Sequence, residues 1–376
     1  MKYILVPLYL LSLASCSSIF KLKGKLRSEL DTPTKERNPF YAVWIKNLDP
    51  SYSSGNLPIG TGSPFMHEDH LYMGDLSGYM RAYDIEKGVL VWEKKESEAI
   101  NAKASNFEDS IIYGTMSGRL YSRNYLTGKL DYAIDLGSPI ESEPVESDGR
   151  LYIHLRNHKI ISLDAKTGKI IWGYKRSVPF TTTLQRVSKV YPYKNKLLVG
   201  FADGNILALS KEEGIVFWEQ KISSGLKFVD VDASPIAFNN YIVAGSANDK
   251  LKFIDPENGI IKKTIGVIAG HTPVITNSEL VVGSIYGDIY RVNSDGVIKK
   301  KVKLSKDGIS SVVKWGNGFA VSTVGDKLFY VNDELDIRGE FSLGHSQSAV
   351  FGFLQVKDGY LATYSSRNRL YVFKQI

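Results

Sequence analysis

The side chains that could carry chemistry in this chain are its histidines, its single cysteine and a set of recurring aspartates. The six histidines are His67, His70, His154, His158, His271 and His345. None of them belongs to an HExxH motif, which places two zinc ligands on one face of a helix. His154 and His158 are four residues apart, but the residues around them are typical of a strand and its turn. We therefore predict no metal site.

The recurring aspartates share one register. Asp84, Asp164 and Asp255 occupy this register, and other parts of the chain place Ser210, Asn293 and Asn332 there. Short polar side chains of this kind accept hydrogen bonds from the backbone of a turn. Capping of turns accounts for these residues without any proton transfer. We therefore predict no catalytic residue.

This register exists because one phrase of about 20 residues returns eight times. Clear copies begin at Leu71, Ile111, Leu151 and Leu197, and weaker copies begin at Ile242, Leu280, Phe319 and Tyr360. Apolar runs alternate with Gly, Asp and Asn turns within a copy, which predicts four short antiparallel strands. A period of about 40 residues with several strands is the signature of a β-propeller. We predict an all-β, eight-bladed β-propeller of four-stranded antiparallel blades.

Within the first copy we expect the innermost strand at Ser63–Phe65, because a proline recurs at this place and proline favours strand starts and edges. One turn position is shared by Gly78, Gly118, Gly204 and Gly287, and we expect it to need a positive φ. The fifth and seventh copies have Asp249 and Asp326 there, and aspartate tolerates this conformation better than most residues.

Aromatic residues hold another fixed position. Trp92, Trp172 and Trp218 lie 21 residues into their copies, with Tyr132 at the same place once. Trp44 lies before the first copy, in Phe40–Leu48, which resembles the outermost strand of a unit. We predict that the four tryptophans dock neighbouring blades by burying large apolar surfaces. The last copy ends where its own outermost strand would begin, so pairing it with Phe40–Leu48 closes the ring without an open sheet edge.

The start of the chain has the features of a bacterial export signal. Lys2 is followed by the apolar run Tyr3–Leu13, which is too short to span a bilayer. The run ends in Leu13-Ala14-Ser15-Cys16, which resembles the lipobox of bacterial lipoproteins, where the cysteine is acylated. We expect a signal peptide over residues 1–15, a tether carrying lipid on Cys16 over 16–39, and the propeller over 40–376. Ser17, rather than Asp, follows the cysteine, which favours the periplasmic face of the outer membrane.

The charge of the chain argues against nucleic-acid binding. Lys and Arg number 47 and Asp and Glu number 40, which leaves a net charge of +7 over 376 residues. The basic residues are scattered, apart from short groups at 21–25 and 299–303. A nucleic-acid-binding domain usually shows a continuous basic face.

Two phrases carry a family resemblance. Leu163–Trp172 (LDAKTGKIIW) and Ala82–Trp92 (AYDIEKGVLVW) resemble the repeat of pyrroloquinoline-quinone (PQQ) type propellers. This superfamily includes quinoprotein dehydrogenases, which bind the quinone and calcium at the centre of the ring, and a branch without enzymatic activity. The dehydrogenases are usually much longer, and many alcohol dehydrogenases carry an adjacent cysteine pair that is missing here. The length and the lipobox resemble the BamB family of outer-membrane assembly lipoproteins, which implies that no cofactor is bound.

The same resemblance implies a partner surface. Asp230–Pro235 (DVDASP) is similar to a loop whose two aspartates help contact BamA in that family. A Leu-x-Leu-Arg segment contributes to the same surface there. The corresponding stretch here has Leu184, and Arg186 fits only with a shift of one residue. The resemblance thus implies partner binding by Leu184, Arg186, Asp230 and Asp232, whereas capping of loop amides is the alternative for the two aspartates.

The function implied by the resemblance is that of a non-catalytic scaffold of the outer-membrane β-barrel assembly machinery. Its implied partners are the periplasmic POTRA domains of BamA, the rest of the Bam complex, nascent β-barrel proteins and, through Cys16, outer-membrane lipid. Two alternatives stay open: a PQQ-dependent dehydrogenase, and a lipoprotein propeller that serves another envelope complex.

Overall fold

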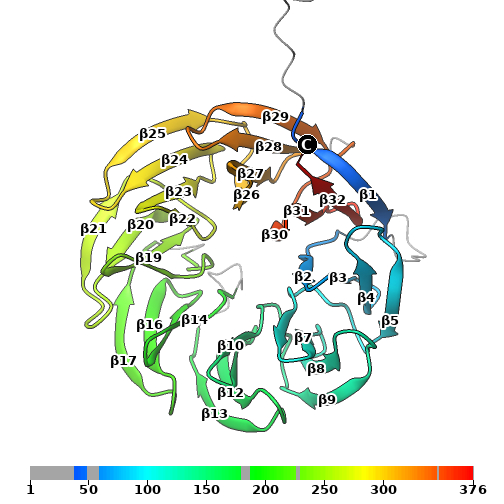
Figure 1. Ribbon diagram of the computed structural model, residues 1–376. Coiled ribbons are helices and arrows are strands. Elements are labelled where there is room, and N and C mark those ends of the chain that lie inside the picture. Colours follow the sequence, from blue (N-terminus) through cyan, green and yellow to red (C-terminus); the bar gives the residue numbers. More distant parts are fainter. Residues whose placement is uncertain (1–37, 49–58, 179–186, 226–228, 345–346, 376) are drawn as a thin grey trace, which may run out of the picture. The chain divides into compact units, whose positions relative to one another are not determined.

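A computed structural model of the chain describes residues 38–48, 59–178, 187–225, 229–344 and 347–375 (Figure 1). Within these ranges the chain forms strands and no helix, and hence nothing helical that could cross a lipid bilayer. The strands pair into eight four-stranded antiparallel sheets, arranged as blades around one centre (Figure 1). The predicted all-β, eight-bladed propeller is therefore confirmed.

The four strands of each blade lie side by side and are ordered from the centre of the ring to its rim. The innermost strands are β2 (Phe65–His67), β6 (Ser105–Phe107), β10 (Val145–Ser147), β14 (Tyr191–Tyr193), β18 (Ile236–Phe238), β22 (Val274–Thr276), β26 (Ile309–Trp315) and β30 (Gln355–Lys357). The second strands are β3 (His70–Gly74), β7 (Ser110–Gly114), β11 (Arg150–His154), β15 (Lys196–Gly200), β19 (Tyr241–Ser246), β23 (Glu279–Gly283), β27 (Gly318–Thr323) and β31 (Tyr360–Tyr364).

The third strands are β4 (Tyr79–Asp84), β8 (Arg119–Asn124), β12 (Lys159–Asp164), β16 (Asn205–Ser210), β20 (Asp249–Ile254), β24 (Asp288–Asn293), β28 (Lys327–Asn332) and β32 (Arg369–Lys374). The outermost strands are β5 (Leu90–Lys95), β9 (Leu130–Asp135), β13 (Ile170–Lys175), β17 (Val216–Lys221), β21 (Ile261–Ile265), β25 (Ile298–Lys303), β29 (Ile337–Ser342) and β1 (Tyr41–Asn47). Blades 1 to 7 therefore follow the chain from β2 to β29, and blade 8 joins β30–β32 to β1.

The N-terminal strand closes the ring, as predicted. β1 pairs antiparallel with β32, from Tyr41 opposite Lys374 to Asn47 opposite Arg369. Figure 1 shows the blue β1 beside the red β32. The ring of Phe40, just before β1, lies 5.4 Å from the ring of Trp315 in blade 7. Residues 41–47 and 369–374 are thus held in one sheet, in which β1 covers the edge of β32 and forms the outermost strand of blade 8.

Two local expectations need correction. The innermost strand of blade 1 begins at Phe65 rather than Ser63, so that Pro64 directly precedes it and its missing amide falls outside the ladder. Asp249 and Asp326 do not have a positive φ. Gly78 does, at +79°, but among the non-glycine residues it is His158 and Asn368 that adopt this conformation in the corresponding turns of blades 3 and 8. In blade 5 the turn is tighter, since Ser246 pairs directly with Asp249.

The tryptophans of the outer strands lie at blade boundaries. The indole nitrogen of each one donates to a backbone carbonyl of the next blade: Trp44 to Ile85 at 2.7 Å, Trp92 to Tyr125 at 2.8 Å, Trp172 to Lys211 at 3.0 Å and Trp218 to Pro256 at 3.0 Å. Buried apolar clusters likewise span neighbouring blades, and the one around Trp92 combines residues of blades 1 and 2. The core is therefore divided among the boundaries between blades.

Candidate functional site

The two faces of the ring carry different connections. On one face, hereafter the connection face, the turns between second and third strands meet the segments that lead to the next blade. Ile100 N, for example, donates to Asp75 O at 2.9 Å. On the opposite hairpin face, the two remaining turns of each blade meet, as Ile85 N does with Asp69 O at 3.0 Å. The hairpins repeat from blade to blade, so residues particular to this chain are expected on the connection face.

The loop Asp230–Pro235, hereafter the acidic loop, lies on the connection face, between blades 4 and 5. Val231 N donates to Phe201 O at 3.1 Å and so holds the loop against blade 4. Asp230 is buried, with 3% of its surface exposed, whereas Asp232 is partly exposed. Of these two aspartates, Asp232 therefore offers the larger surface to a partner. Leu184 and Arg186 fall between β13 and β14, outside the described residues.

Asp230 lies near a pair of buried histidines that the sequence did not reveal as a group. The rings of His154 and His158 are 5.9 Å apart, and His154 Nδ1 lies 3.0 Å from Ser188 O. Burial lowers the pKa of His154 to about 3. Burial also lowers the pKa of His158, which the negative charges of Asp203 and Asp230 partly oppose. Both imidazoles are therefore neutral at pH 7, as expected for groups that pack blade 3 against blade 4.

The recurring aspartates cap turns. Asp164 Oδ1 accepts hydrogen bonds from Thr167 N at 2.8 Å and Thr167 Oγ1 at 2.7 Å, and these bonds lower the pKa of the Asp164 carboxyl. Asp84 Oδ1 accepts one from Lys87 N at 2.7 Å. In the part of the chain that the structure describes, no three His, Cys, Asp or Glu side chains lie close enough together to hold a metal ion.

The innermost strands bring one register of side chains together at the centre of the ring. Four residues before the end of each innermost strand stand Ser63, Lys103, Glu143, Lys189, Ser234, Thr272, Ser311 and Phe353, in blades 1 to 8. We call these eight residues the axial ring. Neighbouring members contact each other: Phe353 N donates to Ser63 Oγ at 2.8 Å, and Lys189 N donates to Ser234 Oγ at 3.1 Å.

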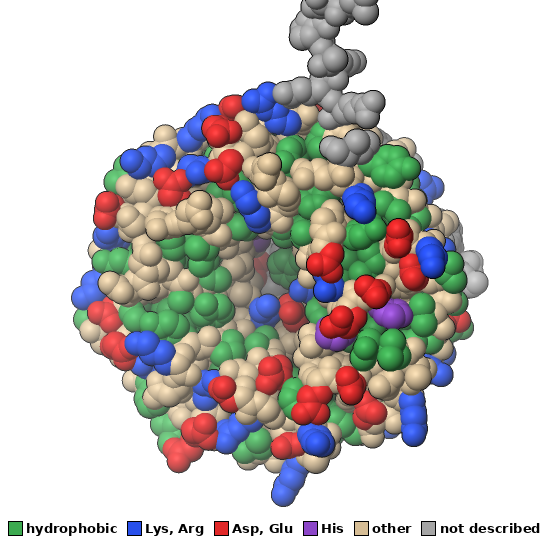
Figure 2. Space-filling view, in the orientation of Figure 1, with side chains coloured by type: hydrophobic (Ala, Val, Ile, Leu, Met, Phe, Trp, Pro, Cys, Tyr) green, Lys and Arg blue, Asp and Glu red, His purple; other side chains and the backbone are tan. Residues whose placement is uncertain are grey.

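The charges of the axial ring are confined to three blades. The ammonium nitrogens of Lys103 and Lys189 lie 3.6 and 3.2 Å from the carboxylate of Glu143. One carboxylate thus faces two cations, and burial together with the charge of Lys189 lowers the pKa of Lys103. The face seen in Figure 2 is hollowed at the centre of the ring, and its acidic and basic side chains are interspersed rather than gathered in a field of one sign.

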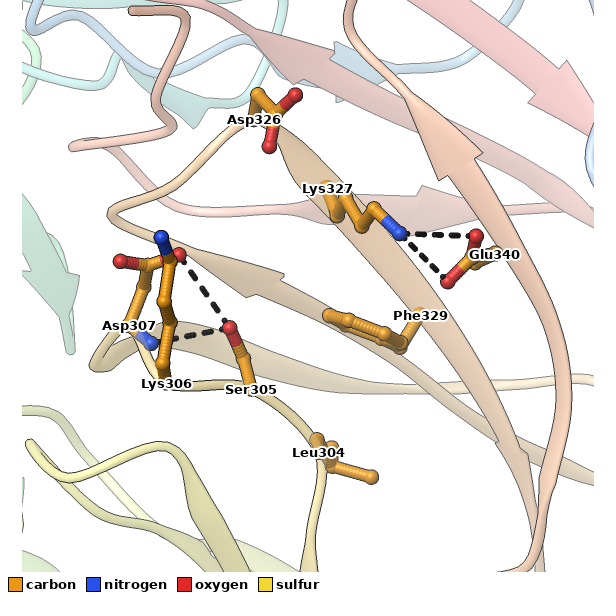
Figure 3. A pocket seen from close by; sticks show the side chains of 8 residues that line it. All are labelled: Leu304, Ser305, Lys306, Asp307, Asp326, Lys327, Phe329 and Glu340. Carbon is orange, nitrogen blue, oxygen red and sulfur yellow. Dashed lines mark hydrogen bonds and ion pairs between the residues drawn. The ribbon is translucent and has the colours of Figure 1, made fainter. Parts of the chain in front are cut away.

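A separate cleft of about 250 Å³ opens between the segment that enters blade 7 and the β28–β29 side of that blade (Figure 3). Leu304 and Phe329 form its apolar part. Lys327 Nζ donates to both carboxylate oxygens of Glu340, at 2.9 and 3.1 Å. The cleft is smaller than typical pockets for drug-sized ligands, and Lys327 and Glu340 already satisfy each other.

Comparison with known proteins places this ring in a family. Residues 77–301, more than half of the chain, match the profile of the family described as outer membrane protein assembly factor BamB. The chain belongs to the BamB family. Its sequence is 26% identical over 294 residues to the outer membrane protein assembly factor BamB of Yersinia pestis, covering 71% of this chain and 72% of that protein.

The chain is also similar to a solved BamB structure and to quinoprotein alcohol dehydrogenases. BamB from Moraxella catarrhalis superposes with a TM-score of 0.76 at 20% identity, covering 89% of this chain and 99% of that one. The quinohemoprotein alcohol dehydrogenase of Comamonas testosteroni has a TM-score of 0.72 at 12% identity, covering 92% and 78%. The quinoprotein alcohol dehydrogenase PedH of Pseudomonas putida is 26% identical over 140 residues, which are 35% of this chain and 24% of that enzyme.

Proposed function

We propose that this protein is a non-catalytic scaffold of the outer-membrane β-barrel assembly machinery. The observation that carries the proposal is membership in the BamB family, together with a ring that matches almost the whole length of a BamB structure. The recurring aspartates Asp84 and Asp164 are engaged in turn capping, and the two histidines between blades 3 and 4 are buried and neutral.

The surface for BamA is the connection face of blades 3 to 5, with the partly exposed Asp232 as the contacting charge. A carboxylate on the rim of an interface steers the encounter and sets the register with a basic partner. Asp230, being buried, would act by holding the loop in place. Leu184 and Arg186 belong to the preceding inter-blade segment and complete the proposed contact.

The test is co-purification with BamA. Asp232→Lys should weaken recovery of BamA about tenfold or more, because reversal of an interface charge replaces attraction by repulsion. Asp109→Lys is the matched control, since Asp109 is exposed in the turn between β6 and β7 on the hairpin face. Equal recovery with both variants would remove Asp232 from the contact. Recovery of another envelope complex in place of BamA would favour the alternative scaffold role.

Attachment to the membrane forms part of the proposal. Cys16, in the segment outside the described residues, would carry the acyl chains that hold the protein at the periplasmic face of the outer membrane. Labelling of cells with a palmitate analogue should mark the protein, and Cys16→Ser should abolish the label and release the protein into the soluble fraction. A labelled Cys16→Ser variant would contradict this assignment.

The similarity to PedH favours one second candidate, a PQQ-dependent dehydrogenase. In the described part of the chain, the acidic and histidine side chains do not form a group that could hold the calcium ion of such a site. Addition of PQQ and calcium to the purified protein, followed by quinone absorbance and dye reduction, decides between the two candidates. Turnover of an alcohol would overturn the scaffold proposal.

A further inference from the structure

Two phenylalanines stand at the centre of the ring, where the other blades carry mainly small or polar side chains. Phe351 and Phe353 are 46% and 49% exposed, and they alternate with the buried Gly352 and Leu354. Both aromatic rings therefore project from the same side of the segment, away from the core. The corresponding residues of blade 1 are Thr61 and Ser63. Half-exposed aromatic side chains at one place indicate a binding surface, because a ligand can bury the rest of their area.

The other side of the axial ring has an excess of positive charge. Lys103 and Lys189 share Glu143, and their side chains are 15% and 39% exposed. Two further carboxylates lie two residues earlier in their segments, nearer the connection face: Glu141, which is 3.4 Å from Arg156, and Asp232. At the level of the two lysines the charge is therefore unbalanced, and a second carboxylate placed there would be stabilised.

The aromatic side lies in blade 8 and the cationic side in blades 2 to 4, so that blade 1 stands between Phe353 and Lys103. Phe353 N is bonded to Ser63 Oγ in blade 1, and Lys103 Nζ lies 5.6 Å from the ring centre of Phe65 in the same blade. We propose that the axial ring binds a polypeptide segment that carries both an aromatic side chain and a carboxylate. The aromatic group packs on Phe351 and Phe353, and the carboxylate is held by Lys103 and Lys189.

A polypeptide fits this ring better than a small polar molecule does. Ser63, Ser234 and Ser311 already accept hydrogen bonds from backbone amides of the next or preceding blade. These hydroxyls already hold neighbouring segments in place, and the remaining features of the axial ring are one apolar and one ionic contact at a distance from each other. A peptide presents such a pair along its chain. The inference goes beyond the proposed contact with BamA, and it concerns the isolated protein.

The experiment measures binding of a fluorescent peptide that ends in Phe with a free carboxylate to the purified full-length protein. Amidation of the terminus should weaken binding about tenfold or more, since a charge-assisted hydrogen bond is lost. Replacement of the terminal Phe by Ser should weaken it by a similar factor, since less apolar area is buried. Equal affinity of the free and amidated peptides, or no binding of either, would overturn the proposal.

Variants locate the contact. Phe353→Ser should weaken the binding of the free and the amidated peptide by about tenfold each, so that the ratio of their two affinities is unchanged. Lys189→Ser should bring that ratio close to one. The matched control is Tyr286→Ser, because Tyr286 is 57% exposed in a turn of the same face. A loss with Tyr286→Ser as large as with Phe353→Ser, in variants with unchanged thermal unfolding, would place binding elsewhere. Competition by free phenylpropionate or PQQ as strong as by the peptide would show a small-molecule site and overturn the polypeptide assignment.

Discussion

The boundary between blades 4 and 5 is the clearest place to measure what the outer-strand tryptophans contribute. Trp218 is 8% exposed, and its indole nitrogen donates to Pro256 O at 3.0 Å. Trp218→Ala removes the apolar burial, leaves a cavity between blades and deprives the carbonyl of its donor. Truncation of a buried tryptophan costs about 3–5 kcal/mol of unfolding free energy. Trp218→Phe keeps most of the apolar area and loses the hydrogen bond, so we expect about 1–2 kcal/mol.

The neighbour in sequence supplies the control. Phe217 has the same secondary structure but is 49% exposed. Phe217→Ala should therefore cost about 1 kcal/mol, because only part of an aromatic burial term is lost. The assay is equilibrium unfolding in urea followed by circular dichroism, with the free energy taken from the midpoint and slope. If Phe217→Ala destabilised the protein as much as Trp218→Ala, the docking argument would be wrong.

The partner of Trp218 across the boundary allows a sharper measurement. Gly259 has a φ of +75°, and a Cβ built there would lie 2.6 Å from Trp218 Cε3. Gly259→Ala alone should therefore suffer both backbone strain, about 1 kcal/mol, and a clash with the indole. In the Trp218→Ala background only the strain remains. The two effects should be less than additive by about 1 kcal/mol or more, and strict additivity would refute a direct contact.

Two further predictions concern stability. Burial lowers the pKa of His154 to about 3, so unfolding takes up a proton below the ordinary histidine pKa. This contribution to the free energy of unfolding is intact above about pH 6.5 and falls by roughly 1 kcal/mol per pH unit toward pH 3. Urea unfolding midpoints measured against pH should show the fall, and His154→Gln should make the dependence on pH less steep. A variant that starts at residue 48 lacks β1 and should expose blade 8 to limited proteolysis, whereas one that starts at residue 38 should resist; equal resistance would mean that β1 is not needed for closure.

The fold could be predicted because the signals that build a blade are local and occur eight times. Gly78 and its equivalents mark turns within a few residues of the strands they join. Closure followed from a count of strands, since the last copy lacked its outermost strand. The positive φ of His158 was not predictable in this way, because histidine, unlike the glycines in the equivalent turns, does not by itself indicate this backbone conformation. There the surrounding blade decides the backbone conformation.

The burial of Asp230 was equally out of reach. The bond from Val231 N to Phe201 O repeats the one from Ile100 N to Asp75 O, but Ala99 stands at the place of Asp230 there, and only the packed structure shows that Asp230 is buried. The axial ring was missed for a related reason. Seven of its members stand in inter-blade segments of different length and composition and Ser311 lies within β26, so their common register becomes visible only when it is counted from the ends of the innermost strands.

The segment that enters blade 5 connects the two proposed binding sites. Asp232 and Ser234 lie two residues apart on the segment that enters blade 5, which Val231 holds against Phe201. Ser234 Oγ in turn accepts the amide proton of Lys189, one of the two cations of the axial ring. A partner that displaces the segment at Asp232 would therefore also displace the backbone of Lys189. Since coupling between two sites is reciprocal, a peptide held at the axial ring would in the same measure change the affinity for a partner at Asp232.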